Sequence, residues 1–582
     1  MFLRSVKAAN GRHEYLRLVE NFRQGEKTRQ RVVLHIGRKD LLAPHLDALV
    51  RLLQADSPDP AWVSPDQVSA PQSWTWGPLL VARHLFDSLG LSALLDQGAS
   101  QSRYRQPLSE RVFPLVANRL TRPGSEHALA GWLEDFYVVS GRGQRWMPEW
   151  KQSRRVKVSF EQLRLWYETL DELLAQKARL EVAVWQQVRD LFSVEPALVF
   201  YDITSTYFEG HGPAELGRFG YSRDGKPRNR QIVVGVVMME GWPIAHHVFA
   251  GNRMDQTTVA AVVQDLRQRF GLGRVVFVGD RGMVTLKNVE HLREEGQGYL
   301  VGLQRRNRKD VPEYIEQAEA RGVWEECPVG ISAAEQATPP QTRVCEVPGK
   351  EPGVRVFVVH SEEREQYERG MRELSMERVR QDLEALRVRV EKGELREAEK
   401  IGAAAAKALT RNHGHRYFSW ELRRNRFHYF EHPVNFPRER ACEGKYVIQT
   451  EEPNLSPVEA VASYKQLNEV ERGFAHLKGL MEVRPVYHHK DDRVRAHVFV
   501  AALALLLDRA LEKKLRAAGS ALSSPAAWQA LETVRCVQMQ IGERTKLCVT
   551  RGSRQAAEAL KILRLTELDP PEPVKAEKTP MW

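Results

Sequence analysis

Two aspartates hold positions in the chain that suit catalysis. Asp202 follows the apolar run ALVFY, and Asp280 follows the run RVVFVG. Short, nearly continuous apolar runs are typical of buried central strands. A carboxylate at the carboxyl end of such a strand lies at the rim of the sheet, where open α/β sheets bind ligands. We therefore expect the two side chains to converge on one site; the alternative is that each caps the following turn, as aspartates often do.

A third candidate acid, Glu471, belongs to a segment with helical periodicity, SYKQLNEVERGFAHLKGLM. At about 100° per residue, one stripe of this helix contains Tyr464, Asn468, Glu471, Ala475 and Lys478. The adjoining apolar stripe contains Leu467, Val470, Phe474, Leu477 and Met481. This arrangement predicts that Glu471 lies beside the buried seam rather than out in water. The alternative is an ordinary amphipathic helix with surface charge.

The spacing Tyr464-x2-Leu467-x3-Glu471-x6-Lys478 resembles the Tyr-x2-Arg-x3-Glu-x6-Lys signature of DDE transposases from bacterial insertion sequences. It follows the two aspartates in the order that this family has. The resemblance covers about residues 198–304 and 456–511. One branch of the group is particularly similar to this chain. The similar segments are YDITSTYFEG, GYSRDGKPRNRQIVVGV, GDRGM and VERGFAHLKGLMEVRPVYHHKDDRVRAHVFVAALAL. The arginine of the signature falls on Leu467 here, and Arg472 is a nearby candidate substitute.

This resemblance implies an RNase H-like core in which Asp202, Asp280 and Glu471 are the catalytic and metal-binding triad. The implied cofactor is Mg²⁺ or Mn²⁺, with two ions in each active site. Two such ions can stabilise the attacking and the leaving oxygen of a phosphodiester, and carboxylates are suitable ligands for them. Water would first free a 3′-OH at the transposon end, and that 3′-OH would then attack target DNA. The chemistry needs no covalent protein intermediate.

The resemblance also implies contacts to DNA. Tyr464 and Lys478 are expected to contact the cleaved strand, and Arg472 and Arg281 are further candidates. The loop GRFGYSRDGKPRNRQ adds the basic residues Arg223, Lys226, Arg228 and Arg230, which could hold backbone phosphates. A solvent-exposed hairpin is the alternative for this loop. The expected partners are double-stranded DNA, as terminal inverted repeats and as target, and a second copy of the chain in a homodimer on DNA.

The elements that must position these residues follow from the change of period after residue 196. Three predicted strands come first, followed by a helix, a strand, a helix and a strand. The first three are expected to meander and the later ones to alternate with helices, which predicts an α/β fold with a mixed sheet flanked by helices. A β-containing insertion would interrupt this core. A charged helical stretch inside the insertion, from Glu362 to Glu397, has apolar positions from Met371 to Val390 at helical spacing.

The predicted organisation has eight parts. They are a basic β-rich N-terminal unit (1–54), a proline-rich linker (55–76), a helical region expected to bind DNA (77–195), the first part of the RNase H-like core (196–304), the insertion (305–450), the second part of the core (451–515), a C-terminal region (516–568) and a disordered tail (569–582). The first 39 residues contain ten Lys and Arg against three Glu. Contact with DNA and a solvated basic face are both open for this unit.

The composition is that of an ordinary globular protein with an excess of positive charge. The net charge is +11, which favours polyanionic partners such as nucleic acid or an anionic membrane surface.

The longest apolar run, residues 498–507, is too short to span a bilayer, and no secretory signal is apparent, so we expect no membrane association. Five scattered cysteines fit a reducing cytoplasm. The resemblance to bacterial transposases implies a location at the nucleoid. The spacings of His476, His488, His489 and His497 match no zinc signature.

Two other functions share most of these features. An RNase H-like nuclease that cuts without strand transfer would use the same triad, and only the Tyr464–Lys478 signature favours transposition. A DNA-binding protein descended from a transposase would keep the fold without catalysis. The presence of all three acids argues against this second alternative.

Overall fold

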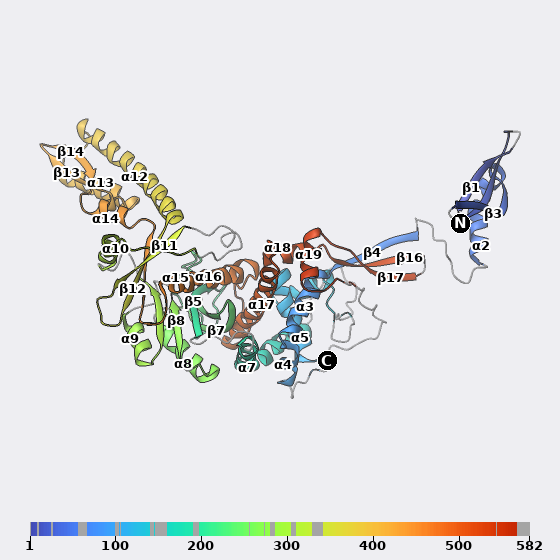
Figure 1. Cartoon of the computed structure of the whole chain (residues 1–582), viewed down its shortest axis with the longest axis horizontal. Helices are drawn as coiled ribbons and strands as arrows, with labels where there is room; N and C mark the ends of the chain where they lie inside the picture. Colours follow the sequence, from blue (N-terminus) through green and yellow to red (C-terminus); the bar gives the residue numbers. More distant parts are fainter. Residues whose placement is uncertain are drawn as a thin grey trace. The chain divides into compact units, whose positions relative to one another are not determined.

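The computed structural model of the chain is shown in Figure 1. It describes all residues except 1, 9–10, 25–26, 56–66, 99–103, 105, 140–144, 146–159, 190–196, 255–256, 273, 280–285, 304–309, 329–340, 543, 567 and 569–582. The chain divides into two compact units. The first contains Met1–Ser73 and Val537–Cys548, and the second contains Trp74–Cys536 and Val549–Trp582.

An antiparallel sheet of three strands begins the first unit. Its strands are β1 (Phe2–Lys7), β2 (Glu14–Gln24) and β3 (Lys27–Arg38), in that order across the sheet. Short helical segments follow, namely α1 (Lys39–Leu42), η1 (Ala43–His45) and α2 (Leu46–Ala55). Arg4 stands directly opposite Arg17 in the β1–β2 pairing. This pairing places two like charges in facing positions on the sheet.

A second three-stranded sheet joins distant parts of the sequence. Strand β4 (Val68–Thr75) neighbours β16 (Arg535–Ile541), which neighbours β17 (Arg544–Val549). Strand β4 lies inside residues 55–76, which the composition predicts to be a linker. That prediction is therefore wrong for the end of the segment, because β4 has a partner strand from the C-terminal region to bond with. Residues 56–66 of the predicted linker lie outside the described residues.

The described part of residues 77–195 is mainly helical, as its periodicity predicts. It contains α3 (Gly77–Ser88), α4 (Leu91–Gln97), α5 (Leu108–Thr121), α6 (Leu129–Asp135) and α7 (Phe160–Arg189). The long helix α17 (Asp491–Ala517) packs against α5, α7 and α3. Helices α18 (Ser524–Leu531) and α19 (Arg554–Ile562) pack on each other and on α17.

The central sheet of the second unit is mixed and has nine strands, and five of these match the order expected from the sequence. Those five are β5 (Ala197–Tyr207), β6 (Gln231–Met239), β7 (Trp242–Ala250), β8 (Val275–Gly279) and β9 (Gly298–Gly302). Strands β5, β6 and β7 form an antiparallel meander, whereas β8 and β9 run parallel to β5. Helix α8 (Val259–Phe270) precedes β8, and α9 (Leu286–Glu294) precedes β9. The predicted mixed α/β sheet with helices is confirmed.

The insertion contributes four strands to this same sheet. Beyond β9 the order continues with β15 (Lys445–Thr450), β12 (Arg355–Ser361), β11 (Thr342–Pro348) and β10 (Glu325–Glu326). All four are antiparallel to their neighbours, and Ile448 of β15 stands opposite Gly302 of β9. Helix α10 (Asp310–Arg321) packs against β11, β12 and β15. The insertion therefore lengthens the central sheet instead of forming a separate β domain.

Between β12 and β15 the chain forms a smaller substructure, residues 362–443, which we call the inserted unit. It contains α12 (Glu362–Glu391), α13 (Ala398–Arg411), η4 (Gly414–Arg416), β13 (Phe418–Arg423), β14 (Arg426–Glu431) and α14 (Asn435–Ala441). It has its own hydrophobic core, to which α12 contributes Met376, Val379, Leu383, Leu386 and Val390. Met371, predicted to face a core, is exposed, because the packed face of α12 begins one turn and a half later.

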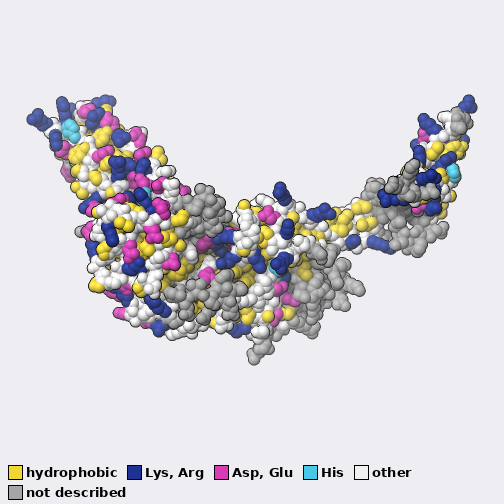
Figure 2. Space-filling view, viewed as in Figure 1, with side chains coloured by type: hydrophobic (Ala, Val, Ile, Leu, Met, Phe, Trp, Pro, Cys, Tyr) yellow, Lys and Arg dark blue, Asp and Glu magenta, His cyan; other side chains and the backbone are white. Residues whose placement is uncertain are grey.

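The β13–β14 turn of the inserted unit is strongly basic. Its two central residues, Arg424 and Asn425, have φ of 49° and 61°, which is the geometry of a tight hairpin. Arg423, Arg424 and Arg426 are exposed. Figure 2 shows Lys and Arg side chains at the end of the molecule that carries this hairpin. Within the described residues, the side chains of Arg424 and Arg426 form no ion pair or hydrogen bond, although the Arg426 backbone pairs with Arg423.

In the described part of the chain, no single helix has the length and apolar character needed to cross a membrane. Helices α3 and α4 reach that length and apolar character only when taken together, and they meet at a bend of 64°.

Candidate active site

Asp202 lies on β5, two residues beyond the last described pairing of this strand with β8, which is Phe200 opposite Val278. It is in the middle of β5 and not at its end, because β6 pairs with β5 as far as Tyr207. The prediction that β5 itself ends at Asp202 is therefore wrong. Asp202 is half-buried, and its Oδ1 accepts a hydrogen bond from the Ile203 amide at 2.7 Å.

Asp280 and Arg281 lie outside the described residues, so their predicted roles stay predictions. The residue before Asp280, Gly279, is the last of β8 and stands opposite Val301 of β9.

Glu471 lies on a helix that packs against the strand of Asp202. This helix, α16 (Leu467–Ala475), contacts β5, as Figure 1 also shows. The predicted apolar stripe is confirmed, since Val470 and Phe474 are buried. Glu471 itself is exposed, so the prediction that it lies beside the buried seam and out of water is wrong. Glu471 is therefore accessible from solvent.

The predicted single helix around Glu471 consists of three pieces. Helix α15 (Pro457–Lys465) ends before Gln466, where the hydrogen-bond pattern tightens, and α16 begins after it. Gln466 donates to the Ala462 and Ser463 carbonyls, and its own carbonyl accepts from Glu469. The bonds from Gln466 to Ser463 and from Glu469 to Gln466 span three residues and interrupt the regular α-helical ladder. Tyr464 and Glu471 are therefore on separate helical segments, α15 and α16.

The third piece is a π-helical turn, His476–Leu480, which carries Lys478. Single π-helical turns occur often at functional sites. The turn is fixed to α17, since His476 Nδ1 lies 2.7 Å from Asp508 Oδ2. Asp508 is fully buried and also accepts from Trp528 Nε1 at 3.0 Å.

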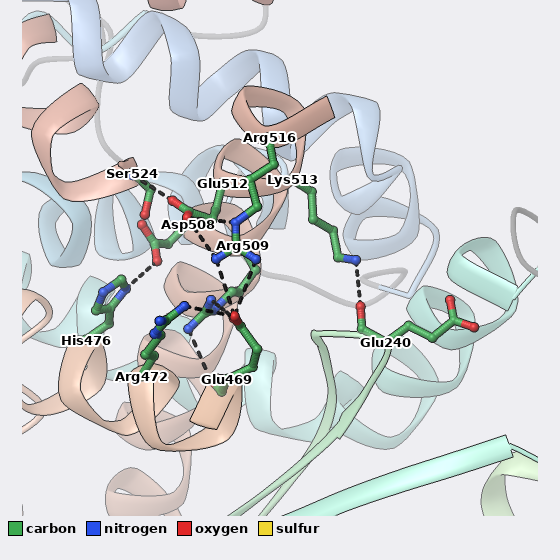
Figure 3. A network of polar contacts seen from close by, with 10 residues as sticks. All are labelled: Glu240, Glu469, Arg472, His476, Asp508, Arg509, Glu512, Lys513, Arg516 and Ser524. Carbon is green, nitrogen blue, oxygen red and sulfur yellow. Dashed lines mark hydrogen bonds and ion pairs between the residues drawn. The ribbon is translucent and has the colours of Figure 1, made fainter. Parts of the chain in front are cut away.

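Glu469 forms the centre of a buried ionic network that joins α16 to α17 (Figure 3). Its carboxylate accepts from Arg509 at 2.8 Å, from Arg472 at 3.1 Å and from Arg516 at 3.3 Å. Arg509 also donates to the Glu469 carbonyl at 3.2 Å. Arg509 and Arg516 come from α17 and hold this buried carboxylate, so they fix the orientation of α16, whereas Arg472 pairs within α16. The Arg472 guanidinium, considered as a DNA contact, is bonded inside this network.

Lys478 lies in a second cluster, close to the C-terminal half of β5. Its Nζ donates to Asp224 Oδ1 at 2.8 Å, and Arg484 Nη1 pairs with the same oxygen. The Asp224 side chain is only 3% exposed. Burial lowers the pKa of Lys478, although Asp224 opposes this change.

The basic loop between β5 and β6 covers the same half of β5. The Arg223 amide donates to Ser205 Oγ at 2.9 Å, and the Lys226 ammonium lies 6.0 Å from the centre of the Tyr207 ring. Arg228 is exposed, and Arg230 is half-buried. The other predicted DNA contact, Tyr464, stacks on Tyr446 with ring centres 5.8 Å apart.

One group of histidines comes together with a carboxylate, away from the elements that carry the acids. Glu126, His488 and His497 are buried, and their ligand atoms lie within 4.8 Å of one another. His497 already uses both ring nitrogens, since Nδ1 is 3.3 Å from Arg119 Nη2 and Nε2 is 3.2 Å from the Val483 carbonyl. A guanidinium at this distance would repel a divalent cation. The cluster is better described as a buried hydrogen-bonded network than as a zinc site.

Three residues of these clusters were missed by the sequence analysis. Asp224 gave a weak signal, because it is the only acid among the basic residues of its loop. Glu469 gave another, since it stands between Leu467 and Val470 on a helix whose neighbouring positions are apolar. Arg484 gave none, because its contact with Asp224 joins parts of the chain far apart in sequence.

Comparisons with known proteins agree with these features. Residues 196–507 match the family model described as Transposase DDE domain, and residues 3–64 match the model described as IS1634 family transposase, N-terminal domain. One similar solved structure is the cryo-EM structure of the piggyBac transposase synaptic complex with hairpin DNA. It is 10% identical over 78% of this chain and 79% of that chain, with a TM-score of 0.32, which is too distant a likeness to carry an argument. No curated protein matches. Because the DDE domain model covers more than half of its length, the chain belongs to the DDE transposases of insertion sequences.

Proposed function

We propose that this chain binds the ends of its insertion sequence as double-stranded DNA, cleaves the phosphodiester backbone there and transfers the freed 3′-OH ends into target DNA. Asp202, Asp280 and Glu471 are the proposed catalytic residues, in a core of the RNase H type. The observation that carries the proposal is the packing of α16, which bears Glu471, on β5, which bears Asp202. Two acids from distant parts of the chain thus belong to elements in direct contact.

The register of the sheet supports Asp280 as the third acid. Phe200 of β5 stands opposite Val278 of β8, and the two strands are parallel. The chain reaches Asp202 two residues after Phe200 and Asp280 two residues after Val278. The two acids therefore have the same sequence offset from the last described pair of these strands.

The donor set fits a hard divalent cation. Carboxylate oxygens are the ligands that Mg²⁺ and Mn²⁺ prefer, whereas none of the five cysteines is near Asp202 or Glu471 in sequence. We propose that the three acids hold two such ions, with Asp202 shared between them. When bound, the ions would stabilise charge on the scissile phosphate and activate the attacking oxygen. The half-buried Asp202 would fix their position, and the exposed Glu471 would leave room for DNA.

Basic residues around the site support DNA as the substrate. Arg223, Lys226, Arg228 and Arg230 belong to one loop beside β5, and contacts from such residues to phosphates would fix the register of the duplex. The helical region 77–195 and the basic β1–β3 sheet are further proposed DNA contacts. Joining two ends to one target requires two sites, so we propose a homodimer on DNA. A bacterial nucleoid location would follow from this substrate.

Strand cleavage and joining by purified full-length protein would test the proposal. The substrate is a labelled duplex of the inverted repeat that flanks the reading frame, with a target plasmid and Mg²⁺. We expect Asp202→Asn and Glu471→Gln to reduce cleavage at least a thousandfold, because each removes a metal ligand. The matched control is Glu482→Gln, another exposed carboxylate, which should cleave like the wild type.

A change of metal provides the second part of this test. Asp202→Cys should be inactive with Mg²⁺ and regain cleavage with Mn²⁺, which accepts a thiolate more readily. Cleavage without any joined product would instead favour a nuclease that does not transfer strands. Unchanged cleavage by Glu471→Gln would remove that residue from the active site.

A further inference from the structure

The position that the family signature gives to an arginine carries no cation in this chain. Leu467 occupies it, and its side chain is buried. Arg472 is the basic residue on the same helix, α16, and it donates to Glu469 within the α16–α17 network. Arg472 is thus paired with a carboxylate of its own helix, and another basic residue can supply the phosphate contact expected from this part of the signature.

Arg484 is the basic residue that lies beside Lys478. It shares Asp224 Oδ1 with Lys478, the other basic residue of the signature. Three separate segments meet at this carboxylate: the loop between β5 and β6, the π-helical turn after α16 and the segment that leads to α17. The Lys478 side chain is 15% exposed and that of Arg484 is 31% exposed, so both reach the surface.

The cluster is tied to the strand that bears Asp202. Next to Asp224 in the loop, the Arg223 amide donates to Ser205 Oγ, three residues beyond Asp202 on β5. Two residues after Arg484, the Val486 amide donates to the Tyr207 carbonyl at 3.0 Å. The two segments that supply the carboxylate and the guanidinium are thus both bonded to the C-terminal half of β5.

The charges of the cluster favour an anion. Two cations share one carboxylate, which leaves a formal charge of +1. A lysine ammonium has three N–H donors and an arginine guanidinium has five, so most donors remain after the bonds to Asp224. A guanidinium can also hold a phosphate through two parallel bonds, which a lysine cannot do. Asp224 Oδ2 has no hydrogen-bond partner among the described residues.

We propose that Arg484 makes the phosphate contact that Leu467 cannot make, together with Lys478 on the backbone of a bound DNA end, and that Asp224 is the positioning residue for both cations. This inference rests on the proposed function. Without the carboxylate, the two cations would repel each other and separate. The competing interpretation is a structural cluster that only fixes the loop against the segment before α17.

Binding and cleavage measured separately would test the inference. The equilibrium affinity for the terminal-repeat duplex is measured in EDTA at several salt concentrations, and the single-turnover cleavage rate is measured in Mg²⁺ at saturating DNA. Arg484→Ala should lower affinity about tenfold and reduce the slope of log K against log salt by about 0.9, since one phosphate contact is lost. The matched control, Arg267→Ala, removes an exposed arginine of α8 that is likewise paired with a carboxylate, Glu295, and should keep the wild-type slope.

Two further variants separate positioning from charge. Arg484→Lys keeps the charge, so we expect the wild-type salt slope with slower cleavage. Asp224→Asn keeps both cations, so affinity should not fall, but cleavage at saturating DNA should decrease because the cations are no longer held. Thermal midpoints of all variants are recorded to detect unfolding. If Arg484→Ala does not fold, the Arg484→Lys variant still tests the inference.

The outcomes distinguish the inference from the proposed function. If the wild type binds the duplex but does not cleave it, the proposed catalysis fails, while the salt slopes still test Arg484. If the wild type cleaves and folded Arg484→Ala keeps the wild-type slope and rate, the inference is overturned alone. If cleavage decreases in each variant only in proportion to its loss of thermal stability, the inference is also overturned. The cluster would then have only a structural role.

Discussion

Glu469 and Glu471 are two residues apart on α16, and their surroundings are opposite. The Glu469 side chain is 12% exposed and contacts three arginines, whereas Glu471 is exposed. A buried carboxylate with several charged partners loses hydration but gains bonds of fixed geometry. We interpret Glu469 as the residue that fixes the helix, so that Glu471 can face solvent without moving.

Replacement of Glu469 by glutamine should destabilise the second unit. A neutral amide cannot balance Arg509, whose side chain is 4% exposed, and breaking a buried ion pair costs about 3 kcal/mol or more. We expect a thermal midpoint lower by several degrees for Glu469→Gln in the full chain. Glu482→Gln, an exposed substitution, should remain within about 0.5 kcal/mol of the wild type. Equal midpoints for the two variants would show that the network contributes little to stability.

At the scale of elements, hydrophobic periodicity predicted those strands and helices that depend on local sequence. The apolar runs before Asp202 and Asp280 predicted β5 and β8, and the change of period predicted the order from β5 to β9, because burial on both faces leaves a continuous apolar pattern. The same pattern could not show that β5 continues to Tyr207. That extension depends on pairing with β6, which is a tertiary interaction.

What the sequence could not predict depends on contacts between distant segments. Strand β15 has an ordinary strand composition, and nothing in it indicates that it pairs with β9. The break of the signature helix at Gln466 has no glycine or proline to announce it. The sharing of Asp224 by Lys478 and Arg484 likewise depends on how three segments fold against β5. Local helix and strand propensities give no information on any of these three features.

Strand β7 carries a histidine that should make stability depend on pH. Burial lowers the pKa of His247 to about 4, although Asp265 opposes this change. The charged and titratable groups that act on it are Asp265 on α8, Lys177 and Glu181 on α7, and His246 on β7. Since the folded pKa lies below the ordinary value of about 6.5, the neutral imidazole contributes stability above pH 6.5. This contribution is lost as the pH falls from 6.5 towards 4.

Urea denaturation midpoints at pH 7.5, 5.5 and 4.5 would measure this effect. The loss expected from His247 is about 1.4 kcal/mol for each pH unit in that window. His247→Gln should therefore show a flatter decline than the wild type. His428→Gln, at an exposed histidine of β14, should decline like the wild type. A His247→Gln profile parallel to the wild type would mean that this imidazole is protonated in the folded state.

At the scale of the whole molecule, the insertion has two parts with different relations to the catalytic sheet. Strands β10, β11, β12 and β15 continue the sheet. The inserted unit leaves the sheet at Ser361 and returns at Gly444, and these two residues are adjacent, because the Ser361 amide donates to the Gly444 carbonyl at 2.9 Å. With a core of its own, the unit is joined to the sheet at one point, like a domain inserted into a loop.

Removal of the inserted unit should therefore leave the catalytic sheet folded. Residues 362–443 would be replaced by Asn-Gly, which suits a tight connection between the antiparallel strands β12 and β15. We expect the shortened chain to keep a cooperative thermal transition and to cleave end DNA, because Asp202 and Glu471 lie on elements outside the unit. We also expect weaker DNA binding with a smaller salt slope, since the arginines of the β13–β14 turn are lost.

Substitution of the turn in the full chain isolates the cause of that weaker binding. Arg424→Ala combined with Arg426→Ala removes two exposed cations that make no ion pair within the described residues, and the turn geometry does not depend on their side chains. If the turn contacts phosphates, this variant should reproduce most of the slope change of the shortened chain, about 0.9 for each contact. If it binds like the wild type while the shortened chain binds weakly, the DNA contact belongs to another surface of the inserted unit. If the shortened chain fails to fold, the unit supports the catalytic sheet, and its separate core does not make it independent.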